Sequence, residues 1–395
     1  MTPPKKTLLV QDFLRSDPSW EKSLQDPPYS VKVSRDSLFG RNLLMLKYNQ
    51  MESDLSIPLV KECRGLVLDA DSLEVVSFPF TKFFNFGEPH AARIDPFSAK
   101  VLQKVDGSLM KVVRLGNDLL VSTNGTIDAF KASVVPQPGC SFGSFGEIFQ
   151  SVLSRKVPPG GNPLGLFREG FTYMFEMVSP WTRVVIPYKE TDLYFLGARD
   201  NSTFLEILPH DHPLSGIFPV PKVYPMKTLS DCIRAAKELP WDEEGYVVVD
   251  KDFNRVKVKS PAYLQVHHLK GESGSMSYRR AIDIVRSNEI DEIAGYFPEF
   301  REGLEECRRR FLWLIESTEN SWEEYLKADA SLPTRKDKAL YIKEKFRFPG
   351  IAFGLLDGKI SSVRDHFMKI PTESLMKMLG YRESKNGEWQ ERTQV

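Results

Sequence analysis

Between residues 43 and 259 the chain alternates short apolar, β-branched or aromatic runs with turn residues, a pattern typical of β-strands. The predicted strands are Leu43–Tyr48, Gly65–Leu68, Glu74–Ser77, Val112–Thr123, Tyr173–Val178, Leu193–Gly197, Tyr246–Val249 and Val256–Lys259. Regular helical crossovers between these runs are scarce. The pattern therefore favours antiparallel sheets over a doubly wound parallel sheet.

Helices are predicted within the same region at Phe145–Lys156 and at Ser230–Leu239, the second with Ser230 as its N-cap. The first lies inside Pro136–Gly170, a segment that begins and ends with clusters of proline and glycine. Such clusters mark loops, so the segment is predicted to be an insertion or a mobile cover.

After Lys270 the hydrophobic period becomes helical. A run of small residues at 271–275 reads as a linker, which places a domain boundary near residue 272. The helices predicted beyond it are Arg279–Ser287, Glu302–Glu316, Trp322–Leu326, Arg335–Phe346 and Thr372–Leu379. The fold class is therefore α+β: antiparallel sheets with flanking helices in residues 1–271, followed by a smaller all-α domain in residues 272–395.

Composition places the chain among ordinary globular proteins, because 41% of its residues are hydrophobic and 27% are charged. Lysine plus arginine equals aspartate plus glutamate, 53 of each, which excludes a basic coat for nucleic acid. A site for nucleic acid would have to be a local groove.

The cysteines are spread one to a region, at Cys63, Cys140, Cys232 and Cys307, with no Cys-x-x-Cys pair. This spacing argues against a zinc knuckle or a disulfide framework and favours a reducing compartment. The first apolar run is too short for a signal peptide, and no apolar stretch approaches membrane-spanning length. We therefore expect a cytoplasmic protein.

Lys104, in the stretch Lys-Val-Asp-Gly-Ser, lies between the apolar run Val101-Leu102 and the alternating run Leu109–Val113. It is expected where one strand turns into the next, a position that suits chemistry better than packing. A lysine acts as a covalent nucleophile only as the neutral amine, and an ordinary lysine is about 0.04% neutral at pH 7. The surroundings must therefore activate it.

Charged residues interrupt several other strands. Arg64 precedes one apolar run, Lys82 lies among phenylalanines, and Glu176 lies inside a hydrophobic strand. Glu244 and Gly245 open another strand, and Lys257 and Lys259 share one face of the next by alternation. Taken singly, a charged residue in such a position more often lies on a solvated rim, or on an edge strand that its charge protects from aggregation. The ordered set is what indicates a site.

That set resembles the ATP-dependent RNA ligases of the bacteriophage RNA ligase 1 family, within the covalent nucleotidyltransferase superfamily. The resemblance covers residues 40 to 268, and the blocks around Arg64 and Lys82 are more specific than Lys-x-Asp-Gly alone. It is carried by the motifs Glu62-Cys63-Arg64-Gly65, Lys82-Phe83-Phe84-Asn85, Lys104-x-Asp106-Gly107-Ser108, Phe175-Glu176, Glu244-Gly245-Tyr246-Val247 and Lys257-x-Lys259-Ser260.

The resemblance implies an RNA ligase that joins 5′-phosphate and 3′-hydroxyl ends in three steps. A lysine takes AMP from ATP and expels pyrophosphate, the AMP moves to the RNA 5′-phosphate, and the 3′-hydroxyl displaces it. The implied catalytic residues are Lys104, Lys257, Lys259 and Glu176. The two strand lysines would favour the neutral amine of Lys104 and neutralise charge on the α-phosphate.

The implied cofactors are ATP and Mg²⁺, with Mn²⁺ as the alternative metal. Glu244 and Glu176 are the expected metal ligands, acting through water, because Mg²⁺ keeps several waters and uses few carboxylates. Phe84 would flank the adenine together with Tyr246 and Val247. The full set implied to bind the nucleotide is Arg64, Lys82, Phe84, Gln103, Lys104, Gly107, Glu176, Glu244, Gly245, Lys257 and Lys259.

The implied partner is an RNA end, in a single strand or a broken stem-loop, with no membrane and no obligatory protein partner. If the chain is encoded by a phage, its compartment is the cytosol of the bacterial host. The helical C-terminal domain would select the RNA. The run Arg308-Arg309-Arg310 there is a candidate RNA contact, although such a run is more often a solvated helix face.

One departure from the family concerns Asn124, which stands before Gly125 where the family has a lysine. A phosphate contact is therefore lost, or is supplied instead by Arg114 or Lys111. The Pro136–Gly170 insertion would also alter the path of the RNA.

Other groups of residues give weaker indications of function. His210-Asp211-His212 and His267-His268 have no third metal ligand at a suitable spacing, and a Gly-x-Ser-x-Gly elbow and a phosphate-binding Gly-x-x-x-x-Gly-Lys loop are both absent. The alternatives that remain are a non-catalytic protein that binds RNA ends, a DNA ligase and an RNA capping guanylyltransferase. The lack of a recognisable oligonucleotide-binding barrel after Lys259 counts against the last two.

Overall fold

The computed structural model describes residues 6–226, 228–268, 278–296, 298–383 and 389–391. The chain forms two compact units, Met1–His267 and His268–Val395. The linker predicted at 271–275 lies outside the described residues. The first unit consists mainly of antiparallel sheets and the second mainly of helices, which confirms the predicted α+β class.

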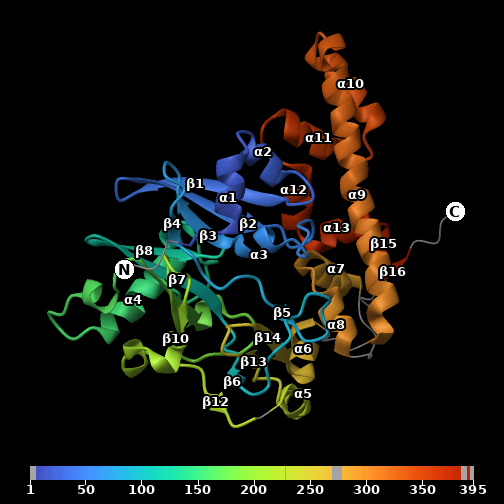
Figure 1. Ribbon diagram of the computed structural model, residues 1–395. Helices are drawn as coiled ribbons and strands as arrows, with labels where there is room; N and C mark the ends of the chain where they lie inside the picture. Colours follow the sequence, from blue (N-terminus) through green and yellow to red (C-terminus); the bar gives the residue numbers. More distant parts are fainter. Residues whose placement is uncertain (1–5, 227, 269–277, 297, 384–388, 392–395) are drawn as a thin grey trace. The chain divides into compact units, whose positions relative to one another are not determined.

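The first sheet contains four strands in chain order, all antiparallel (Figure 1). They are β1 (Val31–Leu38), β2 (Arg41–Tyr48), β3 (Arg64–Asp69) and β4 (Val75–Ser77). The helices beside this sheet are α1 (Leu9–Ser16), α2 (Trp20–Gln25) and α3 (Pro58–Glu62). The sequence did not predict β1, because this edge strand carries mostly polar residues and buries little beyond its first valine.

The second sheet has the order β11-β10-β9-β7-β8. Its strands are β7 (Ser108–Leu115), β8 (Asp118–Thr123), β9 (Phe171–Val178), β10 (Asp192–Asp200) and β11 (Glu206–Ile207). The run predicted at Val112–Thr123 is thus part of the β7–β8 hairpin, which turns at Gly116. The segment Pro136–Gly170 was predicted to be an insertion or a mobile cover. Its helix α4 (Phe145–Lys156) buries Phe149 and Val152 in the core of this sheet. This helix is therefore a packed layer of the domain.

The third sheet has the order β12-β6-β13-β14-β5 and includes one parallel pair, β14 with β5. Its strands are β5 (Phe84–Asn85), β6 (Lys100–Gln103), β12 (Val223–Tyr224), β13 (Gly245–Val249) and β14 (Arg255–Lys259). Helix α5 (Leu229–Lys237) packs against β13 and β14, and α6 (Pro261–His268) follows β14. The predicted cap Ser230 is wrong: Thr228 caps α5, its hydroxyl accepting from the Asp231 amide.

The first two sheets stack face to face because β2 and β3 are apolar on both sides. Leu44 and Leu66 face α1 and α2, while Met45 and Val67 meet Val113 of the second sheet. Strands buried on both faces read as continuous apolar runs, which is why the sequence predicted them.

The second unit is built around one long helix, α9 (Arg301–Ala328). The sequence predicted two helices here because residues 317–321 are polar, but Thr318 is buried and its hydroxyl donates to the Leu314 carbonyl. The other elements are α7 (Tyr278–Ser287), α8 (Ile290–Tyr296), α10 (Arg335–Lys345), α11 (Pro349–Leu356), α12 (Val363–Lys369), α13 (Thr372–Met378), β15 (Tyr381–Glu383) and β16 (Trp389–Glu391).

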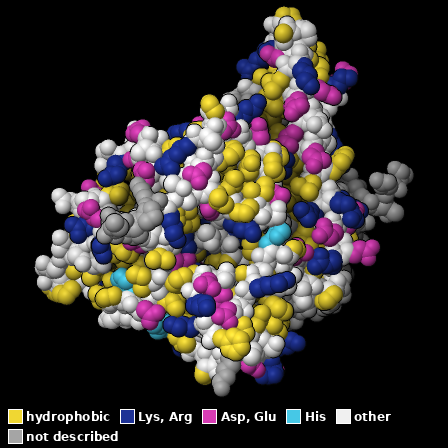
Figure 2. All heavy atoms as spheres, viewed as in Figure 1, with side chains coloured by type: hydrophobic (Ala, Val, Ile, Leu, Met, Phe, Trp, Pro, Cys, Tyr) yellow, Lys and Arg dark blue, Asp and Glu magenta, His cyan; other side chains and the backbone are white. Residues whose placement is uncertain are grey.

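Charge and hydropathy at the surface match the composition. On the face seen in Figure 2, Lys and Arg side chains are interspersed with Asp and Glu side chains. Among the described residues, the structure contains no helix with the length and apolar character needed to cross a bilayer.

A buried ionic triad ties the second sheet to the third. Glu206 of β11 is 5% exposed and pairs with Arg199 of β10 and with Arg255 of β14, the latter at 2.5 Å. The two guanidinium groups also lie over Phe78 and Phe80, at 4.1 and 4.4 Å from the ring centroids. Because β10 and β14 belong to different sheets, the triad fixes the spacing between them.

We expect Glu206→Ala to lower the free energy of unfolding by about 3–5 kcal/mol, because it leaves two buried guanidinium groups without their carboxylate. The measurement is urea unfolding at neutral pH. The matched control is Glu21→Ala, which removes an exposed partner of Arg35 and should change stability by about 1 kcal/mol or less. Equal effects of the two substitutions would contradict the structural role of the triad.

Candidate active site

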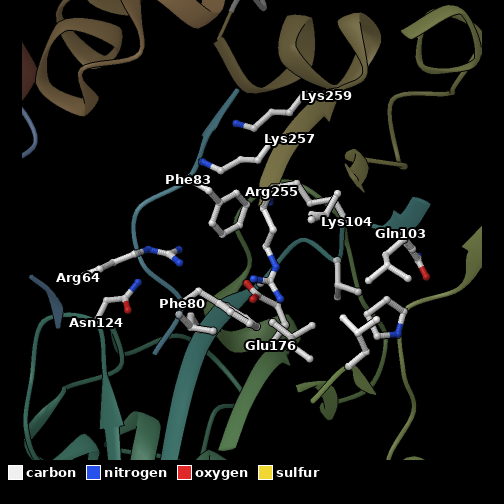
Figure 3. Close-up of a pocket in the computed structure, with 18 residues that line it drawn as sticks. Arg64, Phe80, Phe83, Gln103, Lys104, Asn124, Glu176, Arg255, Lys257 and Lys259 are labelled. Atoms are coloured by element: carbon white, nitrogen blue, oxygen red, sulfur yellow. The ribbon is translucent and has the colours of Figure 1, made fainter. Parts of the chain in front are cut away.

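A cavity of about 270 Å³ lies where the second and third sheets meet, with β3 contributing one edge. Cationic and polar side chains occupy part of its wall and apolar side chains the rest, as for a ligand with one charged and one planar end. Figure 3 shows the labelled part of the lining. The lining residues are Arg64, Phe80, Phe83, Leu102, Gln103, Lys104, Val105, Gly107, Leu109, Asn124, Glu176, Leu196, Leu208, Pro221, Val247, Arg255, Lys257 and Lys259.

Lys104 follows β6 directly, as the sequence predicted. Its amide donates to the Gly245 carbonyl at 2.8 Å, so the main chain at the lysine is an extension of the third sheet. Its Nζ forms an ion pair of 2.6 Å with Oε1 of Glu244. The Lys104 side chain is 20% exposed while Glu244 is 4% exposed, so the amine is accessible and its carboxylate partner is not.

Three cations project from one face of β14, because its alternate residues share a face. Lys259 Nζ lies 4.0 Å from Glu244 Oε1, so Lys259 and Lys104 share one carboxylate. Lys257 Nζ lies 5.3 Å from the centroid of the Phe83 ring. The third cation, Arg255, was missed, although its spacing of two from Lys257 was the signal that would have found it.

Glu176 of β9 reaches the cavity beside these cations. Burial raises its pKa to about 8, an effect that Lys104 opposes and that nearby Glu244 reinforces. Within the described residues, Glu244 Oε2 is buried and has no hydrogen-bond partner. Two desolvated carboxylates, one with an unsatisfied oxygen, form a place where a cation would be stabilised.

These carboxylates do not make a complete protein metal cage. In the described part of the chain, no cluster of three or more His, Cys, Asp or Glu side chains is arranged to hold a metal. Mg²⁺ commonly binds through one or two carboxylates together with water and substrate phosphate oxygens. The donor set formed by Glu176 and Glu244 fits that mode of binding.

Arg64 and Asn124 lie together on one side of the cavity (Figure 3). The Arg64 guanidinium is 5.3 Å from the centroid of the Phe83 ring. Among the described residues, Arg64 Nη1 and Asn124 Oδ1 are both buried without a hydrogen-bond partner. A buried guanidinium nitrogen with an unmet donor suits a phosphate oxygen.

Lys82 and Phe84 were expected at the nucleotide, but the structure places neither in the lining of the cavity. Phe84 is buried, and the ammonium groups of Lys61 and Lys82 lie 5.6 and 5.3 Å from its ring centroid. The neighbouring Phe83 lines the cavity instead. Consecutive strand residues point to opposite faces, so the sequence motif alone could not decide which ring faces inward.

Apolar side chains form the rest of the cavity wall. Of these, the sequence had singled out only Val247. Val247 lines the cavity as expected, whereas Tyr246 faces the opposite side and packs against Tyr224 at 4.9 Å between ring centroids. A β-bulge in β10 between Phe195 and Gly197 leaves Leu196 in the lining. Such a bulge adds one residue to a strand, bends the strand locally and redirects a side chain, and a sequence does not reveal it.

Two residues of the motifs serve to fix the site in place. Asp106 is buried and accepts hydrogen bonds from the Val185 and Ile186 amides at 3.0 and 2.8 Å and from the Tyr263 hydroxyl at 3.0 Å. It therefore ties the loop after Lys104 to α6 and to the chain after β9. Glu62 accepts from the first amides of α1, Val10 among them, and burial raises its pKa to about 7.

Gly245 and the histidines also have structural explanations. A Cβ on Gly245, whose φ is +134°, would overlap the Val258 carbonyl, so the adjacent strand requires this glycine. Gln103 and Gly107 line the cavity as predicted. His212 accepts from the Leu214 amide at 3.1 Å in a turn, and the side chains of residues 267 and 268 lie outside the described part.

A protein-family model described as RNA ligase matches residues 62–263, about half of the chain. The chain belongs to this RNA ligase family. The match spans the motifs at Arg64, Lys104, Glu176, Glu244 and Lys257. The cavity therefore lies within the part of the chain that defines the family.

Individual relatives agree with this assignment. The chain is 28% identical over 291 residues to a protein of Autographa californica nuclear polyhedrosis virus named for a polynucleotide kinase and an RNA ligase, covering 68% of this chain and 40% of that protein. It is 24% identical over 384 residues to an RNA ligase of Rhodothermus phage RM378, covering 80% and 86%. It is 30% identical over 219 residues to RNA ligase 1 of bacteriophage TS2126, covering 53% and 51%. The chain thus spans less than two thirds of the length of the viral and TS2126 proteins.

Solved structures give more distant similarities. An archaeal ATP-dependent RNA ligase matches with a TM-score of 0.46 and 13% identity, over 96% of this chain and 93% of the other. An RNA ligase of Naegleria gruberi matches with a TM-score of 0.33 and 17% identity, over 43% and 52%.

The pKa of Glu176 predicts a pH dependence of stability. Its folded-state value, about 8, exceeds the ordinary 4.5, so the stabilisation is complete below about pH 4.5 and is lost as pH rises through 8. Relative to Glu176→Gln, the metal-free wild type should lose on the order of a few kcal/mol of unfolding free energy between about pH 5 and about pH 9. Denaturant unfolding across this range measures the difference. Parallel curves for the two proteins would contradict a protonated Glu176.

Proposed function

We propose that this chain is an ATP-dependent RNA ligase that joins 5′-phosphate and 3′-hydroxyl ends through a covalent lysyl-AMP and an RNA-adenylate. The observation that carries the proposal is the accessible Lys104 amine, paired with buried Glu244 in a cavity that also presents Arg64 and two strand lysines. Membership in the RNA ligase family and the names of its relatives support the RNA substrate.

In the first step the neutral Lys104 amine attacks the α-phosphorus of ATP. A P–N bond forms, the bond from the α-phosphorus to the bridging oxygen breaks, and pyrophosphate leaves with that electron pair. Glu244 Oε1, at 2.6 Å, is placed to take the proton that Nζ must lose. Its burial keeps water from competing for that role.

The cations around the cavity suit the charge that develops on the phosphate. Lys257 and Lys259 project from the β14 face that lines the cavity, where they can offset negative charge on the α-phosphate oxygens. Arg64 presents a planar donor on the other side, suited first to the phosphates of ATP and later to an RNA 5′-phosphate. The apolar wall at Leu196 and Val247 is suited to the flat faces of adenine.

Glu176 and Glu244 would hold a divalent cation, because the two carboxylates are near enough to influence each other and one oxygen of Glu244 has no partner among the described residues. Mg²⁺ or Mn²⁺ bound there would polarise the phosphate oxygens and offset their charge. Protonated Glu176 must lose its proton for this binding, so the site favours a metal more strongly as pH approaches about 8.

The remaining steps exchange bonds at the same phosphorus and then at the RNA phosphate. A 5′-phosphate oxygen attacks the lysyl-AMP phosphorus, the P–N bond breaks, and Lys104 regains a proton. The RNA 3′-hydroxyl then attacks the 5′-phosphorus and releases its proton to solvent, a phosphodiester forms, and the bond from that phosphorus to the bridging oxygen breaks as AMP leaves with the electron pair. Both steps need an RNA phosphate within reach of Arg64.

We also propose that the protein is cytoplasmic, since its four cysteines are free thiols.

We expect Lys104→Ala to abolish covalent labelling by α-³²P-ATP. The label on the wild type should survive alkali and be released by acid, because protonation of the nitrogen breaks a P–N bond. The matched control is Lys100→Ala on the same strand, whose ammonium pairs with Asp211 outside the cavity. Labelling of the Lys104 variant, or none of the wild type, would overturn the proposal.

The same assay separates the alternative functions. Stronger labelling from GTP than from ATP would indicate a capping guanylyltransferase, and preferential sealing of nicked duplex DNA would indicate a DNA ligase. Binding of 5′-phosphorylated RNA without any label would indicate a non-catalytic protein. A panel of single-stranded, nicked and anticodon-cleaved RNAs then identifies the RNA substrate.

We propose that the second unit, residues 268–395, selects the RNA. The arginine run does not support this by its charge, because Arg309 and Arg310 pair with Glu306 and Arg308 pairs with Glu305. A better candidate is Trp313 of α9, which is 54% exposed and lies 5.4 Å from the Arg347 guanidinium. An exposed ring beside an arginine is suited to stacking an unpaired base.

Trp313→Ala should therefore slow RNA joining roughly tenfold, the loss of one base-stacking interaction, while labelling of Lys104 stays at the wild-type rate. Single-turnover joining of a 5′-phosphorylated single strand measures the first quantity. Leu326→Ala, which truncates another exposed apolar side chain of α9, is the control. An unchanged joining rate would remove Trp313 from the RNA surface.

A further inference from the structure

Lys111 is a fully buried lysine that the proposed chemistry leaves unused. It lies on β7, two residues before Val113, and therefore on the face that packs against the first sheet. Its Nζ donates a hydrogen bond to the Gly65 carbonyl. Apolar side chains otherwise fill this layer, so an amine here requires a specific reason.

The amine lies directly behind the wall of the cavity formed by Arg64 and Asn124. A Cβ built on Gly65 would lie 3.1 Å from Lys111 Nζ and 2.7 Å from the Asn124 carbonyl oxygen. Lys111 thus holds the carbonyl of Gly65, the residue after Arg64, at the point where β3 meets the end of β8. Arg64 Nη1 and Asn124 Oδ1, which have no hydrogen-bond partner in the described part of the chain, belong to residues of the same wall.

The groups that face Lys111 do not neutralise it. The charged groups acting on it are the cations Arg64 of β3 and Lys47 of β2, and together with burial they lower the pKa of Lys111 to about 7. The strands on either side present the uncharged residues Ser122 of β8 and Met174 of β9 in register with it. In the described part of the chain, no carboxylate acts on this amine.

We propose that Lys111 is a positioning residue for the phosphate-binding end of the cavity, and that it becomes protonated when a phosphate group binds against Arg64. The inference rests on the proposed function, which brings phosphates to Arg64. A phosphate there supplies a negative charge that none of the described groups acting on Lys111 provides, and this charge favours the ammonium over the amine. The ammonium then adds a positive charge next to Arg64 on the side away from the cavity. The side chain of Asn124, on the same wall, supplies no charge.

The test measures binding and so does not depend on turnover. ATP is titrated calorimetrically into the whole protein at about pH 8, in two buffers of different ionisation enthalpy, which gives the number of protons taken up. Lys111→Met keeps the unbranched stem and removes the amine, so the fold should persist. Arg114→Met on the same strand is the control: the sequence offered Arg114 as an alternative phosphate contact, but the structure places it outside the lining of the cavity, with its guanidinium donating to the Gly116 carbonyl.

We expect the wild type and the Arg114 variant to take up close to one proton more than Lys111→Met, because the contribution of ATP itself is the same for all three proteins. The Lys111 variant should bind ATP roughly tenfold more weakly. Adding Asn124→Lys to it should restore affinity, by returning a cation to the wall from the adjacent strand. A merely structural lysine would change stability but not proton uptake.

Equal proton uptake and equal ATP affinity in the wild type and Lys111→Met would overturn the inference. Failure of the proposed function looks different: ATP would bind with the expected proton uptake, yet Lys104 would take no label. Loss of affinity without loss of proton uptake would also overturn it, since the proton would then belong to another group.

Discussion

The site depends on one ion pair, that of Lys104 with Glu244. Pairing an accessible amine with a carboxylate that is 4% exposed requires a rigid, dry support, which the third sheet supplies. The Lys104 amide bonds to Gly245, and the Ser260 amide bonds to the Glu244 carbonyl at 2.9 Å. The proposed nucleophile and its proposed proton acceptor are therefore attached at neighbouring strand ends of one sheet, which fixes the main-chain positions from which both side chains extend.

The other supports of the site act on the spacing between sheets. Glu206 links β10 to β14, and Asp106 links the turn after Lys104 to Tyr263 of α6. Each is a buried carboxylate with several donors, an arrangement that is rigid when satisfied and destabilising when one member is removed. Both contacts therefore involve residues that line the cavity or directly adjoin its lining, Arg255 in one case and the turn after Lys104 in the other.

Much of this could be predicted from the sequence, because β2, β3, β9 and β14 have apolar periods and the residues that break them carry charge. Lys104, Glu176, Lys257 and Lys259 were singled out as charged residues beside or within such runs and as an ordered set resembling a family, and the structure brings all four to one cavity. The sequence did not reveal which side chains face the cavity or which charges pair: Phe83 and not Phe84 lines the cavity, and the bridge from Glu206 to Arg255 joins residues 49 positions apart. Tertiary packing decides which of two consecutive side chains points into a cavity and which distant charges pair. A local sequence pattern contains no information on either.

The bulge at Leu196 has a consequence for the range of nucleotides that the cavity could accept. A bulged residue makes no ladder contact of its own, so its side chain can vary in size while β9 and β10 keep their register on either side. The wall of the cavity is thus adjustable at one position without a cost to the sheet. Relatives of this chain, or engineered forms of it, could admit bulkier base analogues by shortening that single side chain.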